Sequence, residues 1–424
     1  MENGVRQTIL DNDLSILTKE VHNAPVASFW IFYRVGSRNE IPGITGISHW
    51  VEHMMFKGTP AFPKGEIDRQ IASNGGVMNG MTWLDLTTYF ETLPSDRFDL
   101  ALCLESDRMI NSVFDPEEVD SERTVIISER QMNENHPSFM LNEDLQATAF
   151  KIHPYHHQVI GWQSDLETMT REDLWQHYKT YYTPKNAIAI CVGDFQTDRL
   201  LDRLNELFGP IPAGPEVPQV GFDEPDQRGE RRVTIRGEGQ TAYVQAAFHA
   251  PAADHADFFP LVILDSILGG AQAMAFFSGG GTTNRTSRLY KALVKTELAS
   301  GSGTSYIPTI DPYLFSFSAT VLAGRSPQEV EDAIWTVVEE IKSEPITEIE
   351  LTRSIKQAKA QFAYSAETVT SQGYWLGFSS IIADYTWLDT FLDNLSGVTA
   401  EDVQRVAQMY LTESNRTVGW YVPN

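Results

Sequence analysis

The chain has 424 residues, of which 42% are hydrophobic and 21% charged, so it is globular in composition and long enough for two or more domains. Asp and Glu number 57 against 32 Lys and Arg, a formal charge of -25. This balance argues against nucleic acid or an anionic membrane surface as the main partner, because phosphate binding needs basic patches. Two cysteines are too few for a disulfide framework. Without a membrane span or a signal-peptide pattern, we expect a cytoplasmic protein.

Alternation of apolar and polar residues predicts strands, and apolar residues three or four apart predict helices. In chain order the predicted elements are strands at 14–17 and 28–33, a helix at 44–55, a strand at 79–89, a helix at 116–134, a strand at 242–248 and a helix over much of 347–370. Strands and helices mix without regular βαβ alternation. We therefore expect an α+β fold with antiparallel sheets packed with helices.

A proline-rich segment marks the middle of the chain. Residues 210, 212, 215 and 218 are all proline, which forbids helix and forces an extended connector. The sequence therefore predicts an N-terminal domain at 1–209, a linker at 210–230 and a C-terminal domain at 231–424.

One pattern occurs near the end of each half. Thr170 and Thr399 each precede acidic residues that suit a helix N-terminus. Asn186 and Asn415 each close a turn before an apolar strand, and both pairs stand 229 residues apart. The constant offset predicts that the two halves arose by duplication.

The segment His49-Trp50-Val51-Glu52-His53 has the residue types and spacing of a metal-binding motif. A helix turns about 100° per residue, so positions i, i+3 and i+4 lie on one face and both imidazoles can reach one metal ion. Zinc held by two imidazoles and a carboxylate keeps a fourth position for water and lowers the pKa of that water. The order His-x-x-Glu-His is the inverted form of the zinc-peptidase motif. Glu52 is then placed to act as the general base.

A third ligand is expected from another rigid element, and the predicted helix at 116–134 is the natural donor. Asp115 can cap this helix and Pro116 suits its first position. The glutamates on it are Glu117, Glu118, Glu122, Glu129 and Glu134. Glu122 and Glu129 stand seven residues apart, hence on one stripe, but spacing alone does not choose between them.

The segment from His49 to Thr59 resembles the signature of the pitrilysin (insulinase-like) metallopeptidases, in particular the processing-peptidase branch. Further shared segments are 35–40, 74–76, 153–161 and 287–290. The resemblance implies that Glu129, which follows His53 by 76 residues, is the third zinc ligand and that Glu122 supports the site. It also implies two homologous halves forming one side of a peptidase chamber. We therefore expect a zinc metalloendopeptidase with one Zn2+ per chain that hydrolyses peptides or unfolded segments.

The resemblance also suggests where substrate binds. Asn79, Gly80, Met81 and Thr82 fall on the strand to which the substrate backbone adds in relatives, although an ordinary structural strand is an equal alternative. The glycine-rich segment at 269–284 lacks the pattern of a phosphate-binding loop, and a substrate-touching loop and a flexible connector are equal alternatives.

One departure from the family pattern concerns partners. Self-sufficient relatives bring an Arg and a Tyr from the second half, and Val294 and Ser300 stand at those positions here. We therefore expect a heterodimer in which a related subunit supplies the missing pair. A homodimer using Arg288 or Tyr306 is the alternative. Two other functions stay open: a noncatalytic structural subunit of a larger assembly, and a zinc hydrolase acting on something other than peptides.

Overall fold

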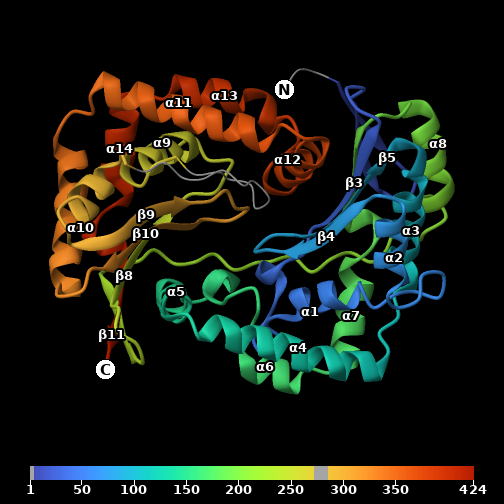
Figure 1. Cartoon of the computed structure of the whole chain (residues 1–424), viewed down its shortest axis with the longest axis horizontal. Coiled ribbons are helices and arrows are strands. Elements are labelled where there is room, and N and C mark those ends of the chain that lie inside the picture. Colours follow the sequence, from blue (N-terminus) through green and yellow to red (C-terminus); the bar gives the residue numbers. More distant parts are fainter. Residues whose placement is uncertain (1–3, 272–284) are drawn as a thin grey trace. The chain divides into compact units, whose positions relative to one another are not determined.

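The computed structural model describes residues 4–271 and 285–424, which divide into two compact units (Figure 1). The first unit comprises residues 1–131, 157–221 and 366–388, and the second comprises 132–156, 222–365 and 389–424. Each unit thus combines segments that are distant in the sequence. Residues 210–230, all of them described by the structure, contain neither helix nor strand. The limits 1–209, 210–230 and 231–424 stay a prediction for the two homologous halves.

The first unit is built on a six-stranded sheet in the order β1-β2-β6-β3-β5-β4. Its strands are β1 (Val5–Ile9), β2 (Ser15–Glu20), β3 (Val26–Tyr33), β4 (Val77–Thr82), β5 (Thr87–Pro94) and β6 (Ala187–Gly193). All neighbours are antiparallel except β2 and β6, which run parallel. Every residue of β6 is buried, as its apolar sequence predicts for a strand covered on both faces.

Residues 79–89, predicted to form a single strand, form a β-hairpin instead, so that prediction was wrong. The chain reverses between Trp83 and Leu86, where the Trp83 N–H donates to the Leu86 carbonyl at 2.8 Å. Residues on either side belong to β4 and β5, which pair antiparallel. The alternating pattern continues through the turn, and this continuity concealed the reversal. The hairpin leaves β4 at the edge of the sheet.

Helices cover both faces of this sheet (Figure 1). The helices and short turns of the first unit are α1 (Ile47–Met54), α2 (Glu66–Ser73), α3 (Asp99–Asn111), α4 (Pro116–Glu134), α6 (Gln163–Thr168), α7 (Arg171–Tyr181), α8 (Thr197–Phe208), α12 (Val369–Ile382), η1 (Ser37–Asn39), η2 (Ser95–Arg97) and η4 (Pro184–Asn186). From α8, the Phe208 ring lies 6.1 Å from that of Phe29 on β3. On the other face α12 packs against β3 and β6. The unit therefore takes one covering helix from late in the chain.

Two glycines let α12 approach the sheet closely. A Cβ at Gly373 would come within 2.5 Å of Trp30, and one at Gly377 within 2.1 Å of Phe32. Contacts below about 3 Å are not tolerated without movement of rigid rings, so only glycine fits at this approach.

The second unit repeats the same sheet with five strands in the order β7-β11-β8-β10-β9. The strands are β7 (Arg231–Gly237), β8 (Tyr243–Ala250), β9 (Ala299–Tyr306), β10 (Tyr313–Val321) and β11 (Arg416–Pro423). Again one pair, β7 with β11, is parallel and the others are antiparallel. The shared order and directions confirm the α+β fold with two homologous halves, with one parallel pair in each sheet as the detail that sequence analysis did not foresee.

The helices and short turns of the second unit are α5 (Pro137–Ala149), α9 (Phe258–Leu268), α10 (Pro327–Ser343), α11 (Glu348–Ser365), α13 (Trp387–Gly397), α14 (Ala400–Tyr410), η3 (Pro154–His156), η5 (Tyr290–Val294, a π turn) and η6 (Glu413–Asn415). Helix α5, from early in the chain, packs against β7, β8 and β11. Each half of the sequence therefore gives one covering helix to the sheet of the other half. Among residues 4–271 and 285–424, no helix is long and apolar enough to cross a bilayer.

The predicted repeat appears at the same place in each unit. Thr170 caps α7 and Thr399 caps α14, each accepting a hydrogen bond from the backbone N–H three residues later. Asn186 and Asn415 each donate to the carbonyl of the last residue of the preceding helix, at 2.9 and 2.8 Å. The same side chains thus end the helix and lead into β6 or β11.

Candidate metal centre

Helix α1 carries the motif, and a buried carboxylate holds its first turn. Glu40 accepts hydrogen bonds from the backbone N–H of Gly46 at 2.7 Å and of Ser48 at 2.9 Å. N–H groups at a helix N-terminus lack partners within the helix, and a carboxylate there also interacts favourably with the helix dipole. Burial raises the pKa of Glu40 to about 7 although both bonds favour its ionised form. Sequence analysis did not assign this anchoring role to Glu40.

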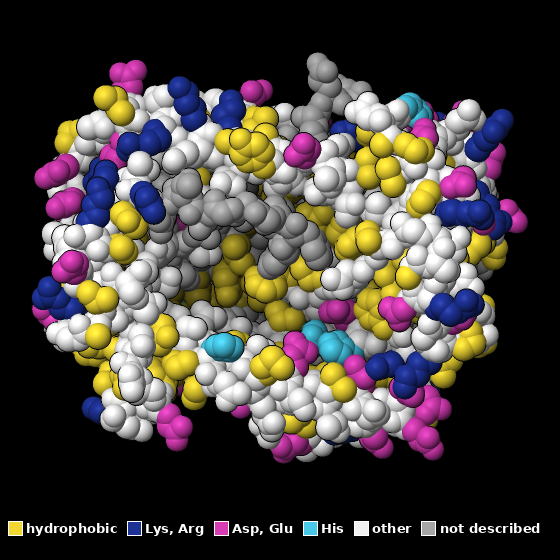
Figure 2. Space-filling view, viewed as in Figure 1, with side chains coloured by type: hydrophobic (Ala, Val, Ile, Leu, Met, Phe, Trp, Pro, Cys, Tyr) yellow, Lys and Arg dark blue, Asp and Glu magenta, His cyan; other side chains and the backbone are white. Residues whose placement is uncertain are grey.

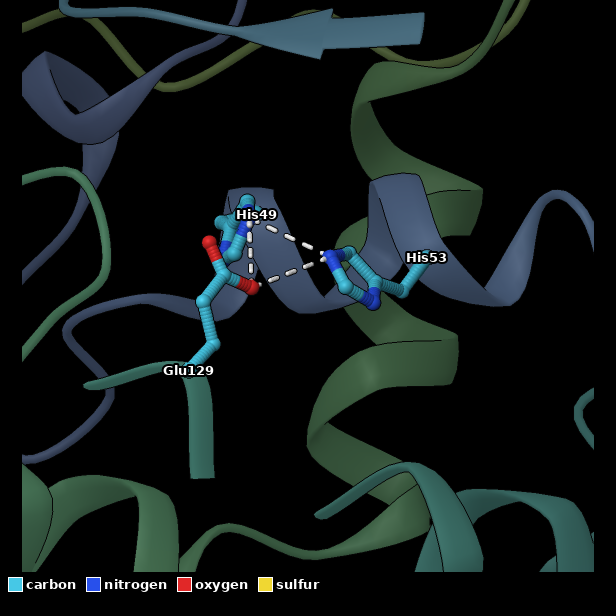
Figure 3. Close-up of side chains that lie close together, drawn as sticks. All are labelled: His49, His53 and Glu129. Carbon is cyan, nitrogen blue, oxygen red and sulfur yellow. Dashed lines mark hydrogen bonds and ion pairs between the residues drawn. The ribbon is translucent and has the colours of Figure 1, made fainter. Parts of the chain in front are cut away.

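Three predicted ligand atoms converge in front of α1 (Figure 3). His49 Nε2 lies 3.2 Å from His53 Nε2, and the two nitrogens lie 3.9 and 3.7 Å from Glu129 Oε2 on α4. Ligands of one tetrahedral zinc ion at about 2.1 Å stand about 3.4 Å apart, so the three atoms fit a zinc ion with a fourth position open. Among the described residues, this is the group of three His, Cys, Asp or Glu side chains that is close enough to hold a metal.

The pKa values of the two imidazoles shift in opposite directions. Burial, together with the neighbouring His53, lowers the pKa of His49 to about 3, so His49 is neutral and keeps a lone pair for a metal. Burial also disfavours the charged form of His53, but its hydrogen bond to Glu122 and the carboxylates of Glu52 and Glu129 outweigh burial and raise its pKa. A metal cation at this centre would place a positive charge beside the carboxylates of Glu52 and Glu129.

Glu122 fixes the orientation of His53 from behind. Its Oε1 lies 2.9 Å from His53 Nδ1, so Nδ1–H donates to the carboxylate and Nε2 is left facing the site. The other carboxylate oxygen pairs with Lys57. Burial acts to raise the pKa of Glu122, and the bonds to His53 and Lys57 overcome it and lower the pKa. Lys57 was not predicted as part of the site, although it stands in the segment that carries the family resemblance.

Glu52 lies beside the three ligand atoms but outside the group. It is buried, and its Oε2 accepts a hydrogen bond from the Thr82 hydroxyl at 2.7 Å. Burial raises the pKa of Glu52, and hydrogen bonds from Thr82 oppose the shift. A buried carboxylate next to the three candidate ligand atoms is placed to exchange a proton with a water molecule in the site.

The predicted substrate residues lie on the edge strand β4. Asn79 is exposed and Gly80 and Met81 are partly exposed, whereas the side chain of Thr82 is buried and turned to Glu52. A Cβ at Gly80 would lie 3.0 Å from the rings of Phe56 and Tyr89, so glycine lets the strand lie flat on them. An edge strand presents unpaired backbone N–H and C=O groups to a further strand.

The centre is open to solvent on one side. Figure 2 shows histidine side chains beside acidic ones at the surface in the region of α1 and α4. The side chains of His49, His53 and Glu129 are exposed by 14%, 22% and 42%. The exposed fraction rises from the first ligand to the third, so Glu129 is the ligand nearest to bulk water.

The second unit contains the positions at which relatives of the family have an Arg and a Tyr, together with the two alternative residues Arg288 and Tyr306. Val294 ends the π turn, and Ser300 on β9 is exposed. Arg288 binds the Glu350 carboxylate with two nitrogens, at 3.1 and 2.8 Å, and the buried Tyr306 hydroxyl donates to the Pro251 carbonyl at 2.7 Å. Of the glycine-rich segment 269–284, residues 272–284 lie outside the described residues.

Comparison with known proteins identifies the family. Residues 15–162 match the family model described as Insulinase (Peptidase family M16), and residues 168–358 match Peptidase M16 inactive domain. The chain is 28% identical to the zinc protease PqqE of Helicobacter pylori, over 98% of this chain and 92% of that protein. It is 24% identical to the mitochondrial-processing peptidase subunit beta of Lentinula edodes, over 96% and 87%. The crystal structure of a protease from Helicobacter pylori superposes with a TM-score of 0.92 at 27% identity, covering 99% of each chain.

Proposed function

Because the chain belongs to the insulinase family of peptidases, we propose that it is a zinc endopeptidase that hydrolyses peptides or unfolded segments. The convergence of His49 Nε2, His53 Nε2 and Glu129 Oε2 beside Glu52 carries this proposal. Relatives named zinc proteases support it. A cytoplasmic location remains a prediction from the sequence.

His49, His53 and Glu129 would hold one zinc ion per chain, with Glu122 behind His53. The ion would lower the pKa of a water molecule and polarise the carbonyl of the scissile peptide bond. Two neutral nitrogens and one carboxylate leave that ion a net positive charge, which suits both effects.

Glu52 would act as the general base and then as the general acid. Its free oxygen would accept the proton of the attacking water and pass it to the amine that leaves. Burial keeps bulk water from competing for this proton. With their Nε2 lone pairs given to the zinc ion, the two histidines could not accept this proton, so the Glu52 carboxylate would be the acceptor in reach.

The substrate backbone would add to β4 as a further strand. Main-chain hydrogen bonds along Asn79, Gly80 and Met81 give affinity that does not depend on the substrate's side chains. This mode suits an unfolded segment, because a folded protein does not present a free strand. The net charge of -25 favours basic peptides through long-range attraction.

A related subunit would complete the site. Val294 and Ser300 offer no cation or phenol for substrate, and Arg288 and Tyr306 already have partners in the second unit. The similarity to a protein named as subunit beta of a processing peptidase supports a heterodimer. Donors that stabilise the carbonyl oxyanion contribute roughly 10²- to 10³-fold each, so the isolated chain should cleave slowly.

A noncatalytic structural subunit is the second candidate function, and the family description of residues 168–358 as an inactive domain favours it for the second half. A scaffold has no need for three ligand atoms, a buried base and a carboxylate behind one ligand, all in the first half. The intact set in the first half therefore favours the peptidase.

The test uses the full chain, alone and mixed with a related subunit. Turnover of a quenched peptide is measured before zinc removal by a chelator, after removal and after zinc is restored. We expect chelation to abolish turnover, zinc to restore it and the partner to increase it. Equal turnover per zinc with and without the partner would refute the partner requirement, and turnover that survives chelation would refute the zinc mechanism.

A further inference from the structure

The proposed base is held by a single side chain outside its own helix. Thr82 is the last residue of β4, and its hydroxyl is 2.7 Å from Glu52 Oε2. The Thr82 hydroxyl is the donor and the carboxylate oxygen is the acceptor. Hydrogen bonds to charged acceptors are roughly twice as strong as neutral ones, and both partners are buried.

The neighbouring hydroxyl leaves Thr82 free to donate to Glu52. Thr87 Oγ1 lies 2.9 Å from the Val35 carbonyl, which can only accept, so the single proton of Thr87 is committed there. Thr82 Oγ1 is 3.4 Å from Thr87 Oγ1 and much closer to Glu52. The shorter bond to a charged acceptor therefore takes the Thr82 proton.

This bond restricts a flexible side chain. A glutamate has three rotatable bonds, and ordering it costs on the order of 1–2 kcal/mol of conformational entropy. With Oε2 held by the Thr82 hydroxyl, Oε1 would be the oxygen that takes the proton. General-base catalysis needs the acceptor within hydrogen-bond reach of the water, and a displacement of about 1 Å can cost on the order of 10²-fold.

We infer that Thr82 is a positioning residue for Glu52 and not a substrate contact. It acts through Glu52: it orients the carboxylate and leaves one defined oxygen to take the proton. Thr82 also belongs to the strand along which the substrate would lie, so one strand sets the position of both the peptide and the base. This inference rests on the proposed peptidase function.

The role of Thr82 can be tested by removing its hydroxyl group while the shape of the side chain is kept. Thr82→Val keeps the branched side chain, and Thr82→Ser keeps the hydroxyl. Thr88→Val is the matched control, because Thr88 is also a buried threonine of this hairpin but donates to the Ile31 carbonyl. Each variant is assayed as the full zinc-loaded chain, in the assembly that gives the parent its highest turnover.

We expect Thr82→Val to lower kcat roughly 10- to 100-fold with KM changed less than about twofold and with zinc content and Tm close to the parent. Thr82→Ser should restore most of kcat, and Thr88→Val should match the parent in kcat. A rise in KM at unchanged kcat would make Thr82 a substrate contact and overturn the inference.

A double-mutant cycle with Glu52→Gln separates action through Glu52 from any other action. If Thr82 acts only through Glu52, then Thr82→Val causes no further loss of the residual hydrolysis when Glu52 is already Gln. The same loss in both backgrounds would overturn the inference. A parent chain that hydrolyses no peptide would overturn the proposed function and this inference together, whereas an active parent with an equally active Thr82→Val overturns the inference alone.

Discussion

The two homologous halves share a framework and differ in the helix beside the edge strand. In the first unit α1 packs next to β4 and α7, and in the second α9 packs next to β9 and α14. Helix α9 has Val262, Asp265 and Ser266 at the spacing of the motif. The fold therefore offers the same place for a site in both halves, and in the described part of the chain the side chains make only one of these places a candidate metal centre.

The second half also lacks a carboxylate equivalent to Glu129 on the neighbouring helix. Helix α11, which packs against α9, carries its acidic residues Glu348 and Glu350 in the first turn. A cavity of about 50 Å³ beside Asp265 is lined from α11 by Ala358 and Phe362. One carboxylate among apolar walls does not make a zinc site, which needs three ligands.

One element of the site nevertheless has a counterpart in the second half. Burial raises the pKa of Asp265 to about 7, and hydrogen bonding to Thr304 on β9 opposes the shift. A buried helix carboxylate beside a strand threonine thus occurs in both halves. This pair therefore belongs to the shared framework, and among the residues that the structure describes, candidate metal ligands stand beside it in the first half only.

The largest expected effect, on both zinc content and activity, comes from replacing the two histidines of α1 by residues that do not bind metal, as at the corresponding positions of α9. The His49→Ala, His53→Ala double variant should fall from about one zinc per chain to none and lose all peptide hydrolysis, because one carboxylate cannot retain the ion. Elemental analysis of the purified chain measures the zinc. Val262→Ala with Ser266→Ala in α9 is the matched control and should keep zinc. Full zinc occupancy in the double histidine variant would sink the assignment.

Removing the base alone should cost nearly as much activity without the loss of metal. Glu52→Gln preserves shape and removes the proton acceptor, so turnover should fall on the order of 10²- to 10⁴-fold with about one zinc retained. Asp265→Asn makes the same change in the second half and should leave turnover unchanged. If Glu52→Gln cleaved a peptide at near the parental rate, the base would lie elsewhere.

The two glutamates of α4 should differ in their effect on zinc affinity. Glu129→Gln weakens binding more, because it changes a ligand, whereas Glu122→Gln removes only the charge behind His53 and should cost about 10- to 100-fold. Competition with a chelator of known affinity measures both. A larger loss in Glu122→Gln than in Glu129→Gln would exchange the two roles.

The sequence predicted this centre because its information is local. Two histidines and a glutamate at helical spacing converge wherever the helix forms, and the family resemblance chose Glu129 among five glutamates. The Thr82–Glu52 bond joins residues 30 positions apart across a turn and left no local pattern. The exchange of α5 and α12 was equally hidden, because periodicity shows which face of a helix is apolar but not which sheet covers it.

Close packing of α12 should also show in stability. Gly377→Ala forces the helix away from Phe32, so the free energy of unfolding should fall by about 1–3 kcal/mol. Gly397→Ala in α13 is the matched control, because its Cβ would meet no atom within 4 Å. In the second unit the close glycine is on the strand instead, at Gly419 under Leu141. Urea titration measures both variants, and equal stability would show that α12 has room to shift.

The smallest expected effect depends on pH. Burial lowers the pKa of His177 on α7 to about 3, whereas Val406 is at the matching place on α14. In the unfolded chain His177 is protonated below about pH 6.5, whereas in the folded chain it stays neutral down to about pH 3. The free energy of unfolding therefore falls as pH drops from 6.5 towards 3. Between pH 7 and 5 this group should account for about 2 kcal/mol, measured as the difference in urea stability between the parent and His177→Gln. The same pH dependence in both would assign the effect to other groups.

The exchanged helices have a consequence for how the protein is made. When a ribosome has finished the predicted N-terminal half at residue 209, the face of the first sheet that carries Trp30 and Phe32 still lacks α12, which ends at Ile382. At about 5–20 residues per second, roughly 10–30 s of translation separate the two events. For that time a nascent chain exposes aromatic surface that only its own late segment can cover, so the duplicated halves mature together and not one after the other.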